Sequence, residues 1–251
     1  MIKKLICLIA ILFLIVPNAM AFMGPAVAGG GMPVAAGDCP NPGNIIIEED
    51  FENYADGEEW DTDAGLTWTE STATTNTWVG DDDDTITPYG GSGISGLSAG
   101  GHYPQYYAYT AFSEITTGFV NARFQLYHVT GVNDWIGYTV AISDATQIIA
   151  MFRIDDNGYI EPYSNTTAQA NAIVLPSGVW TEVEFRIDVD DADGVDAWYL
   201  WVGGVEYGPY ETYGSVQSYG IDRFNVYNPD TDGYGPFWID DIVMYTGDRC
   251  E

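Results

Sequence analysis

Hydrophobic and polar residues alternate strictly along one long segment, WTEVEFRIDVD (180–190). Val183, Phe185, Ile187 and Val189 fall on one side of this pattern, and the residues between them are charged. Successive side chains of a strand point to opposite faces, so the pattern predicts an antiparallel strand with one buried face. Residues 118–129 and 135–143 alternate in the same way and predict two more strands.

Turn signals join further strands into hairpins. Residues 148–154 and 159–163 flank the segment DDNG (155–158), in which Asn-Gly favours a tight turn. Residues 197–202 and 205–210 flank Gly203-Gly204, which predicts a second hairpin. No segment after the first 21 residues has a convincing helical period. About a dozen strands with turns every 8–12 residues favour a β-sandwich or barrel, built as one all-β domain over residues 44–251.

The final strand FWIDDIVMY (237–245) carries two adjacent acids, Asp240 and Asp241, among apolar residues. Strict alternation assigns Ile239, Val243 and Tyr245 to the face of Asp241, together with Phe237. It assigns Trp238, Ile242 and Met244 to the face of Asp240. Whichever face is buried, a carboxylate then lies among apolar side chains and needs a partner.

The first 21 residues have the features of a signal peptide. Lys3 and Lys4 precede the apolar run 5–16, and Ala19-Met20-Ala21 offers small residues before a cleavage site at Phe22. The run is too short to span a bilayer, which takes about 20 residues. Residues 22–43 follow as a flexible arm rich in Gly, Ala and Pro. We therefore expect a secreted protein, extracellular or periplasmic, without a membrane span.

Charge narrows the choice of partners. Lys3 and Lys4 are the only lysines, so removal of the signal peptide leaves five arginines against 37 acidic residues. Such a surface repels nucleic acids, anionic membranes and acidic polysaccharides. The acidic charge is compatible with four kinds of partner: neutral glycans, cell-surface polysaccharides, cations and basic surfaces. A second interpretation is that the acidic shell serves solubility alone.

Two cysteines follow the signal peptide, Cys39 and Cys250. In a secreted chain an isolated pair predicts one disulfide, here between the two ends of the domain. The alternative is an intermolecular link at each end.

Three segments resemble the concanavalin A-like lectin/glucanase superfamily, which includes laminin-G-like modules. These are EEDFENYADGEEW (48–60), VWTEVEFRIDVDDADGVDAWYLWVGGVEY (179–207) and the closing FWIDDIVMY (237–245). The resemblance implies a jelly-roll β-sandwich of two antiparallel sheets with six or seven strands each. It also implies adjacent first and last strands, and often a structural calcium ion.

Adjacency of those strands predicts a calcium site. Asp240 or Asp241 would then face an acid of the opening strand, either Glu49, Asp50 or Glu52. Close carboxylates repel unless a cation lies between them, and Ca²⁺ prefers such oxygen ligands. The alternative is that Arg249 or Arg223 pairs one aspartate. The acidic loops at 81–84, 188–193 and 230–232 are read mainly as solvated turns, since none completes a calcium-loop pattern.

The sequence lacks the motifs of catalytic relatives. The Glu-x-Asp-x-(x)-Glu pattern of the superfamily's glucanases is missing, and Glu182 and Glu184 are its nearest approximation. Alginate lyases use Arg, Gln-x-His and a Tyr/Lys cluster, but the chain beyond the signal peptide has no Lys and only His102 and His128. We read His128 as a residue at the core edge and expect no catalytic role for the protein.

Aromatic residues beside turns are the candidate glycan-binding residues, because exposed rings bind sugar faces. They are Trp135, Tyr103, Tyr106, Tyr107 and Tyr234. The function that fits best is a secreted, non-catalytic, lectin-like module stabilised by calcium. One alternative is a structural or adhesive subunit that forms oligomers or filaments through residues 22–38, and another is a glycosidase or lyase. Asn165-Thr-Thr is a glycosylation sequon.

Overall fold

The structure, a computed structural model, describes eleven segments of the chain, all within residues 31–251. They are 42–51, 68–70, 106–128, 138–143, 148–155, 157–165, 167–169, 173–189, 197–212, 220–228 and 237–249. Every regular element within them is a β-strand, and no helix in these segments is long and apolar enough to cross a membrane.

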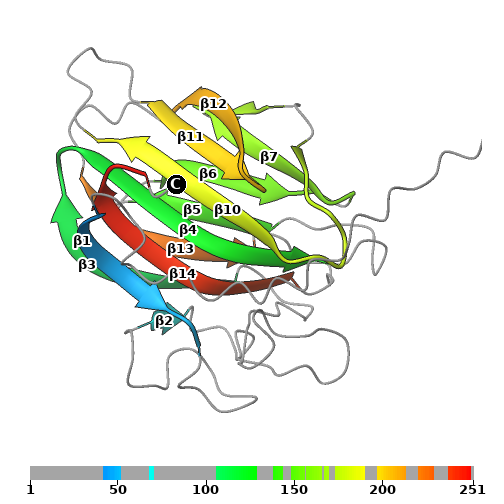
Figure 1. The fold of residues 1–251 in the computed structure, drawn as a ribbon, viewed down its shortest axis with the longest axis horizontal. Helices are drawn as coiled ribbons and strands as arrows, with labels where there is room; N and C mark the ends of the chain where they lie inside the picture. The colour runs from blue at the N-terminus through cyan, green and yellow to red at the C-terminus, as the bar shows by residue number, and fades with distance from the viewer. Residues whose placement is uncertain are drawn as a thin grey trace, which may run out of the picture. The chain divides into compact units, whose positions relative to one another are not determined.

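The strands form two antiparallel sheets (Figure 1). The six-stranded sheet has the order β1-β14-β4-β10-β11-β12, and the eight-stranded sheet has the order β2-β3-β13-β5-β6-β7-β8, with β9 paired to β7. The strands are β1 (Pro42–Glu49), β2 (Trp68–Glu70), β3 (Tyr106–Ile115), β4 (Phe119–His128), β5 (Tyr138–Ser143), β6 (Ile148–Ile154), β7 (Tyr159–Ser164), β8 (Thr167–Ala168), β9 (Ile173–Val174), β10 (Thr181–Asp188), β11 (Ala197–Val202), β12 (Val205–Glu211), β13 (Ile221–Asn228) and β14 (Phe237–Gly247).

Aromatic rings from both sheets meet in the core. Phe124 on β4 lies 6.4 Å from Phe152 on β6 and 5.8 Å from Phe224 on β13, measured between ring centroids. Phe185 on β10 stacks on Phe152 at 5.3 Å. All four rings are fully buried. The prediction of a jelly-roll sandwich of two antiparallel sheets is therefore confirmed.

The alternation in 180–190 is confirmed in β10. Val183, Phe185 and Ile187 belong to the core, so Glu184 and Arg186 lie on the opposite face of the sheet. The predicted turn at Gly203-Gly204 is also present, since Val202 pairs with Val205 and both glycines have positive φ.

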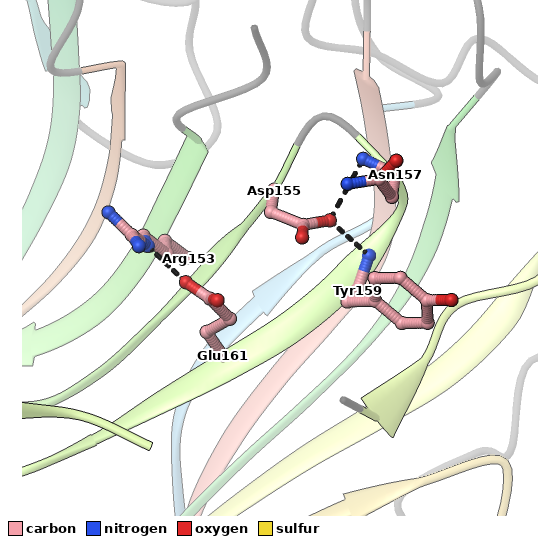
Figure 2. A network of polar contacts seen from close by, with 5 residues as sticks. All are labelled: Arg153, Asp155, Asn157, Tyr159 and Glu161. Atoms are coloured by element: carbon pink, nitrogen blue, oxygen red, sulfur yellow. Dashed lines mark hydrogen bonds and ion pairs between the residues drawn. The ribbon is translucent and has the colours of Figure 1, made fainter. Parts of the chain in front are cut away.

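The first hairpin joins β6 to β7 through residues 155–158. Asp155 N donates to Tyr159 O, and Gly158 has a φ of 78°. Figure 2 shows that one Asp155 carboxylate oxygen accepts from the backbone N–H groups of Asn157, at 2.9 Å, and Tyr159, at 2.7 Å. Arg153 donates to Glu161 across the two strands. The Asn-Gly signal located this turn correctly, because glycine fits the left-handed position that ends such a loop.

The first and last strands are neighbours, as the resemblance implied. In Figure 1 the blue β1 lies beside the red β14, and Glu48 and Glu49 pair with Val243 and Ile242. β1 begins at Pro42, slightly before the expected start of the domain.

Strict alternation along 237–245 is wrong. Ile239, Ile242 and Met244 all belong to the core, although the pattern put Ile239 on the other face. The reason is a bulge between Asp240 and Val243 in the pairing of β14 with β4, where Asp241 has a φ of 48°. A bulge inserts one residue and reverses the facing of all residues beyond it.

Candidate functional site

One face of the six-stranded sheet points away from the core, and we call it the outer face. On β4 the core residues are Val120, Ala122, Phe124 and Leu126, so the residues between them occupy the outer face. Their register partners on β10, β11 and β14 share this face: Glu184, Arg186, Tyr199, Trp201 and Tyr245 are among them.

A pocket of about 410 Å³ opens on this face, and we call it the Trp201 pocket. It is lined by three aromatic residues, three charged residues and one alanine: Phe119, Tyr199, Trp201, Arg186, Asp188, Glu206 and Ala197. These residues come from β4, β10, β11 and β12, which are neighbours in the sheet (Figure 1). Aromatic walls with a few polar groups are typical of small-molecule and sugar sites.

The rings of the pocket are held by contacts with arginine and with each other. The Arg186 guanidinium lies 3.9 Å from the Phe119 ring centroid, and that of Arg249 lies 4.6 Å from the Trp201 ring. The rings of Tyr199 and Trp201 are 6.0 Å apart and tilted by 35°. Such cation–π contacts fix side chains that would otherwise be mobile.

Beside the pocket, Glu184 is fully buried in a hydrogen-bonded network. Its Oε1 accepts from the Tyr245 hydroxyl and its Oε2 accepts from Arg249 Nε, each at 2.7 Å. Burial nevertheless raises the pKa of Glu184 above its ordinary value, outweighing the opposite effects of Tyr245, Arg249 and Arg123. Arg249, one of the two arginines expected to pair an aspartate of 240–241, forms its ion pair with Glu184 instead.

His128 is buried completely at the end of β4, in agreement with its interpretation as a core-edge residue. Among the described residues, neither ring nitrogen has a hydrogen-bond partner. Burial lowers the pKa of His128, so the neutral ring is favoured.

The acids of the predicted calcium site are only partly described. Glu49 faces the interior and accepts from Phe51 N and from the Trp68 indole, at 2.9 and 3.3 Å. Asp240 lies on the outer face, where it accepts from Asp241 N.

Asp50 and Asp241 are the next residues beyond the pair Glu49–Ile242. Glu52 lies outside the described residues. Within the described segments, no three His, Cys, Asp or Glu side chains form a group that could hold a metal ion.

The candidate ligand residues are not among those that line the pocket. Tyr106 and Tyr107 lie on β3, in the eight-stranded sheet. Trp135, Tyr103 and Tyr234 fall outside the described residues, as do the predicted signal peptide and the cysteines Cys39 and Cys250. Asn165 of the sequon is exposed.

Sequence reasoning missed the Trp201 pocket because it searched beside turns. A signal was present in AWYLWV (197–202), where Tyr199 and Trp201 alternate with Trp198, Leu200 and Val202. Both faces of this strand are apolar or aromatic. The face turned away from the core is therefore expected to be covered by another part of the chain or to bind a ligand.

Comparison with solved structures finds likeness in fold, whereas no protein-family model and no curated protein matches the chain. The alginate lyase Aly36B in complex with an alginate trisaccharide has a TM-score of 0.51 at 8% identity, over 81% of this chain and 99% of that chain. The CBM2 module of Lactobacillus casei BL23 phage J-1 evolved Dit gives 0.48 at 12% identity, over 83% and 98%. The alginate lyase vAL-1 from Chlorella virus gives 0.43 at 11% identity, over 81% and 100%. The first of these supports a jelly-roll sandwich, consistent with a concanavalin A-like fold.

Proposed function

We propose that this chain is a secreted, non-catalytic carbohydrate-binding protein that holds a neutral glycan in the Trp201 pocket. The observation that carries the proposal is the pocket itself, about 410 Å³ in volume, with Phe119, Tyr199 and Trp201 among its walls. Rings of this kind match the C–H faces of sugars, and the polar side chains between them match the hydroxyl groups.

The charged residues of the pocket suit a neutral ligand. Asp188 and Glu206 can accept hydrogen bonds from hydroxyl groups, and Arg186 can donate them. Two carboxylates against one guanidinium, on a chain of formal net charge −30, disfavour an acidic sugar. A non-catalytic role is supported by Glu184, which is fully buried beside the pocket with both its oxygens engaged by Tyr245 and Arg249.

Substitution of Tyr199 by alanine tests the pocket directly. We expect affinity for the best ligand of a neutral-polysaccharide panel to fall about tenfold, since truncating an aromatic anchor commonly costs more than 1 kcal/mol. The measurement is affinity electrophoresis followed by titration calorimetry, with reducing ends assayed in the same samples.

The matched control is Tyr163→Ala. Tyr163 is also half-buried, but it lies on β7 of the eight-stranded sheet and contacts Arg153. Equal losses in the two variants, or no binding by the unsubstituted protein to any polysaccharide, would contradict the proposed function. Release of reducing ends would replace it with an enzymatic one.

Calcium is the second part of the proposal, held by Asp240 or Asp241 with Asp50 or Glu52. The support is chemical: Asp50 directly follows β1, Asp240 and Asp241 lie on the neighbouring β14, and carboxylates are the oxygen ligands that Ca²⁺ prefers. We expect EGTA to lower the melting temperature by about 5–10 °C from its value at calcium concentrations near 100 times Kd. Asp241→Asn should abolish this difference, and an unchanged melting temperature in the unsubstituted protein would rule the ion out.

A further inference from the structure

Arg249 connects the Trp201 pocket to a buried carboxylate that does not line it. The guanidinium of Arg249 lies 4.6 Å from the centroid of the Trp201 ring, and its Nε donates to Oε2 of Glu184 at 2.7 Å. Glu184 and Trp201 are register partners on the neighbouring strands β10 and β11 (Figure 1). Trp201 forms a wall of the pocket, whereas Glu184 is fully buried behind it. One arginine side chain therefore contacts both the ring and the carboxylate.

The contact of Arg249 with the ring depends on its contact with the carboxylate. A guanidinium over an indole is held by a weak attraction, and a long side chain loses rotamer freedom when it stays there. The hydrogen bond to Glu184 is charge-assisted and poorly screened by solvent, because the Glu184 side chain is only 1% exposed. The carboxylate therefore fixes the guanidinium, and the guanidinium in turn holds the Trp201 ring in the wall of the pocket.

Ionisable groups of the described residues lie beside Glu184 on each of the strands around it. They are Arg123 on β4, Tyr199 on β11, Glu182 and Arg186 on β10 itself, Tyr245 on β14 and Arg249 after β14. Tyr245, Arg249 and Arg123 favour the ionised carboxylate, but burial outweighs them and raises the pKa of Glu184 above its ordinary value. Glu184 therefore takes up a proton at a higher pH than an exposed glutamate does.

We infer that Arg249 is a positioning residue of the Trp201 pocket, held in place by ionised Glu184, and that glycan affinity is therefore proton-linked: high when Glu184 is ionised and low when it is protonated. The inference rests on the proposed function and adds the regulation of the same site. A neutral carboxyl no longer attracts the guanidinium, so Arg249, whose side chain is 22% exposed, turns toward water and leaves the ring. The ligand then has to order the Trp201 ring itself, which lowers its affinity.

Titration with neutral polysaccharides from pH 8 to pH 5 tests the inference. The probes are hydroxyethyl cellulose, xylan, galactomannan and laminarin, and circular dichroism at each pH shows that the fold is intact. For the polysaccharide that binds, we expect affinity to fall about fivefold or more as the pH drops through the folded-state pKa of Glu184. Binding within this range should release protons, so the calorimetric heat should depend on the ionisation enthalpy of the buffer.

Glu184→Gln assigns the fall to the buried carboxylate. Glutamine keeps the size of the side chain but carries no charge, so affinity should already be low at pH 8 and should not fall further through Glu184. Asp188 and Glu206 line the pocket and also take up protons in acid. The variant leaves both of them unchanged, so any pH dependence that it retains belongs to them.

Two conservative variants distinguish positioning from a structural role. Tyr245→Phe removes a hydrogen bond that favours ionised Glu184, so the fall in affinity should move to higher pH and keep its size. Arg249→Lys keeps a positive charge beside Glu184 but not the planar group that stacks on the ring, so it should keep the pH dependence at a lower affinity. A residue that only stabilises the fold would not move the midpoint of the affinity profile.

A second measurement needs neither a ligand nor these variants at Tyr245 and Arg249. In protein labelled with 5-fluorotryptophan, the fluorine resonance of Trp201 is assigned by its loss in Trp201→Phe. This resonance should shift over the same pH range in the unsubstituted protein, and the shift should be absent in Glu184→Gln.

The outcomes separate this inference from the proposed function. Equal affinity at every pH, a fall that persists unchanged in Glu184→Gln, or a Trp201 resonance that does not move with pH overturns the positioning role of Arg249, while glycan binding in the pocket stands. Absence of binding to every polysaccharide at every pH overturns both the proposed function and its proton linkage.

Discussion

Replacement of Phe185 by alanine is expected to lower the free energy of unfolding by about 3–5 kcal/mol, because it leaves a cavity between the two sheets. Phe185 is fully buried, stacked on Phe152 at 5.3 Å and tilted against Trp198 at 5.4 Å. Phe152 belongs to the eight-stranded sheet and Trp198 to the six-stranded sheet, so the ring bridges the sandwich. Urea unfolding followed by tryptophan fluorescence measures the change.

Two comparison variants show whether the loss comes from the cavity. Phe185→Leu keeps most of the volume and should cost about 1–2 kcal/mol. Val205→Ala, at a residue 54% exposed on β12, should change stability by no more than about 0.5 kcal/mol. A Phe185→Ala loss as small as that of Val205→Ala would mean that the sheets do not meet at this ring.

Local pattern was sufficient to predict the strands. The facing of Val183, Phe185 and Ile187 followed from alternation alone, since every second residue of β10 is charged. The Gly203-Gly204 turn followed from the positive φ that glycine tolerates. Both signals lie within about ten residues, so no knowledge of the rest of the chain was needed.

The facing of β14 could not be predicted in the same way. The bulge at Asp241 depends on the pairing of β14 with β4, more than a hundred residues earlier in the chain. The residue type at position 241 does not reveal the bulge, because aspartate also occurs in ordinary extended strands. One inserted residue then moved Ile242 and Met244 into the core with Ile239.

The Trp201 pocket was missed for a related reason. Its residues Phe119, Arg186, Trp201 and Glu206 lie on four strands, and only the sheet order brings them together. The sequence shows which side chains alternate, but not which strands are neighbours. Turn-adjacent aromatics such as Trp135 were therefore favoured over strand residues.

Three of the five arginines of the chain lie on or against the outer face: Arg123, Arg186 and Arg249. In a chain with 37 acids this distribution concentrates positive charge where carboxylates are buried. Glu184 is fully buried between Tyr245 and Arg249. An ionised carboxylate is costly to bury without a neighbouring cation, and Arg249 supplies that cation.

Arg249→Ala should therefore lower the free energy of unfolding at pH 8 by about 3 kcal/mol, since removing one partner of a buried ion pair leaves an uncompensated charge. The loss should shrink as the pH falls. The pKa of Glu184 is raised in the folded state, so the folded protein holds this proton more tightly than the unfolded chain. Protonation of Glu184 therefore contributes its full stabilisation at pH values below the ordinary pKa of 4.5. This contribution is lost as the pH rises through the pKa of Glu184 in the folded state.

Glu184→Gln provides the matched test of this explanation. Glutamine keeps the size of the side chain and can still accept from Tyr245, but it carries no charge. If the cost of Arg249→Ala is the buried charge, the double variant should recover most of the lost stability at pH 8, and its unfolding free energy should vary less with pH than that of Arg249→Ala. A loss that is the same at pH 5 and pH 8, or that persists in the double variant, would assign the role of Arg249 to its packing on the Trp201 ring at 4.6 Å instead.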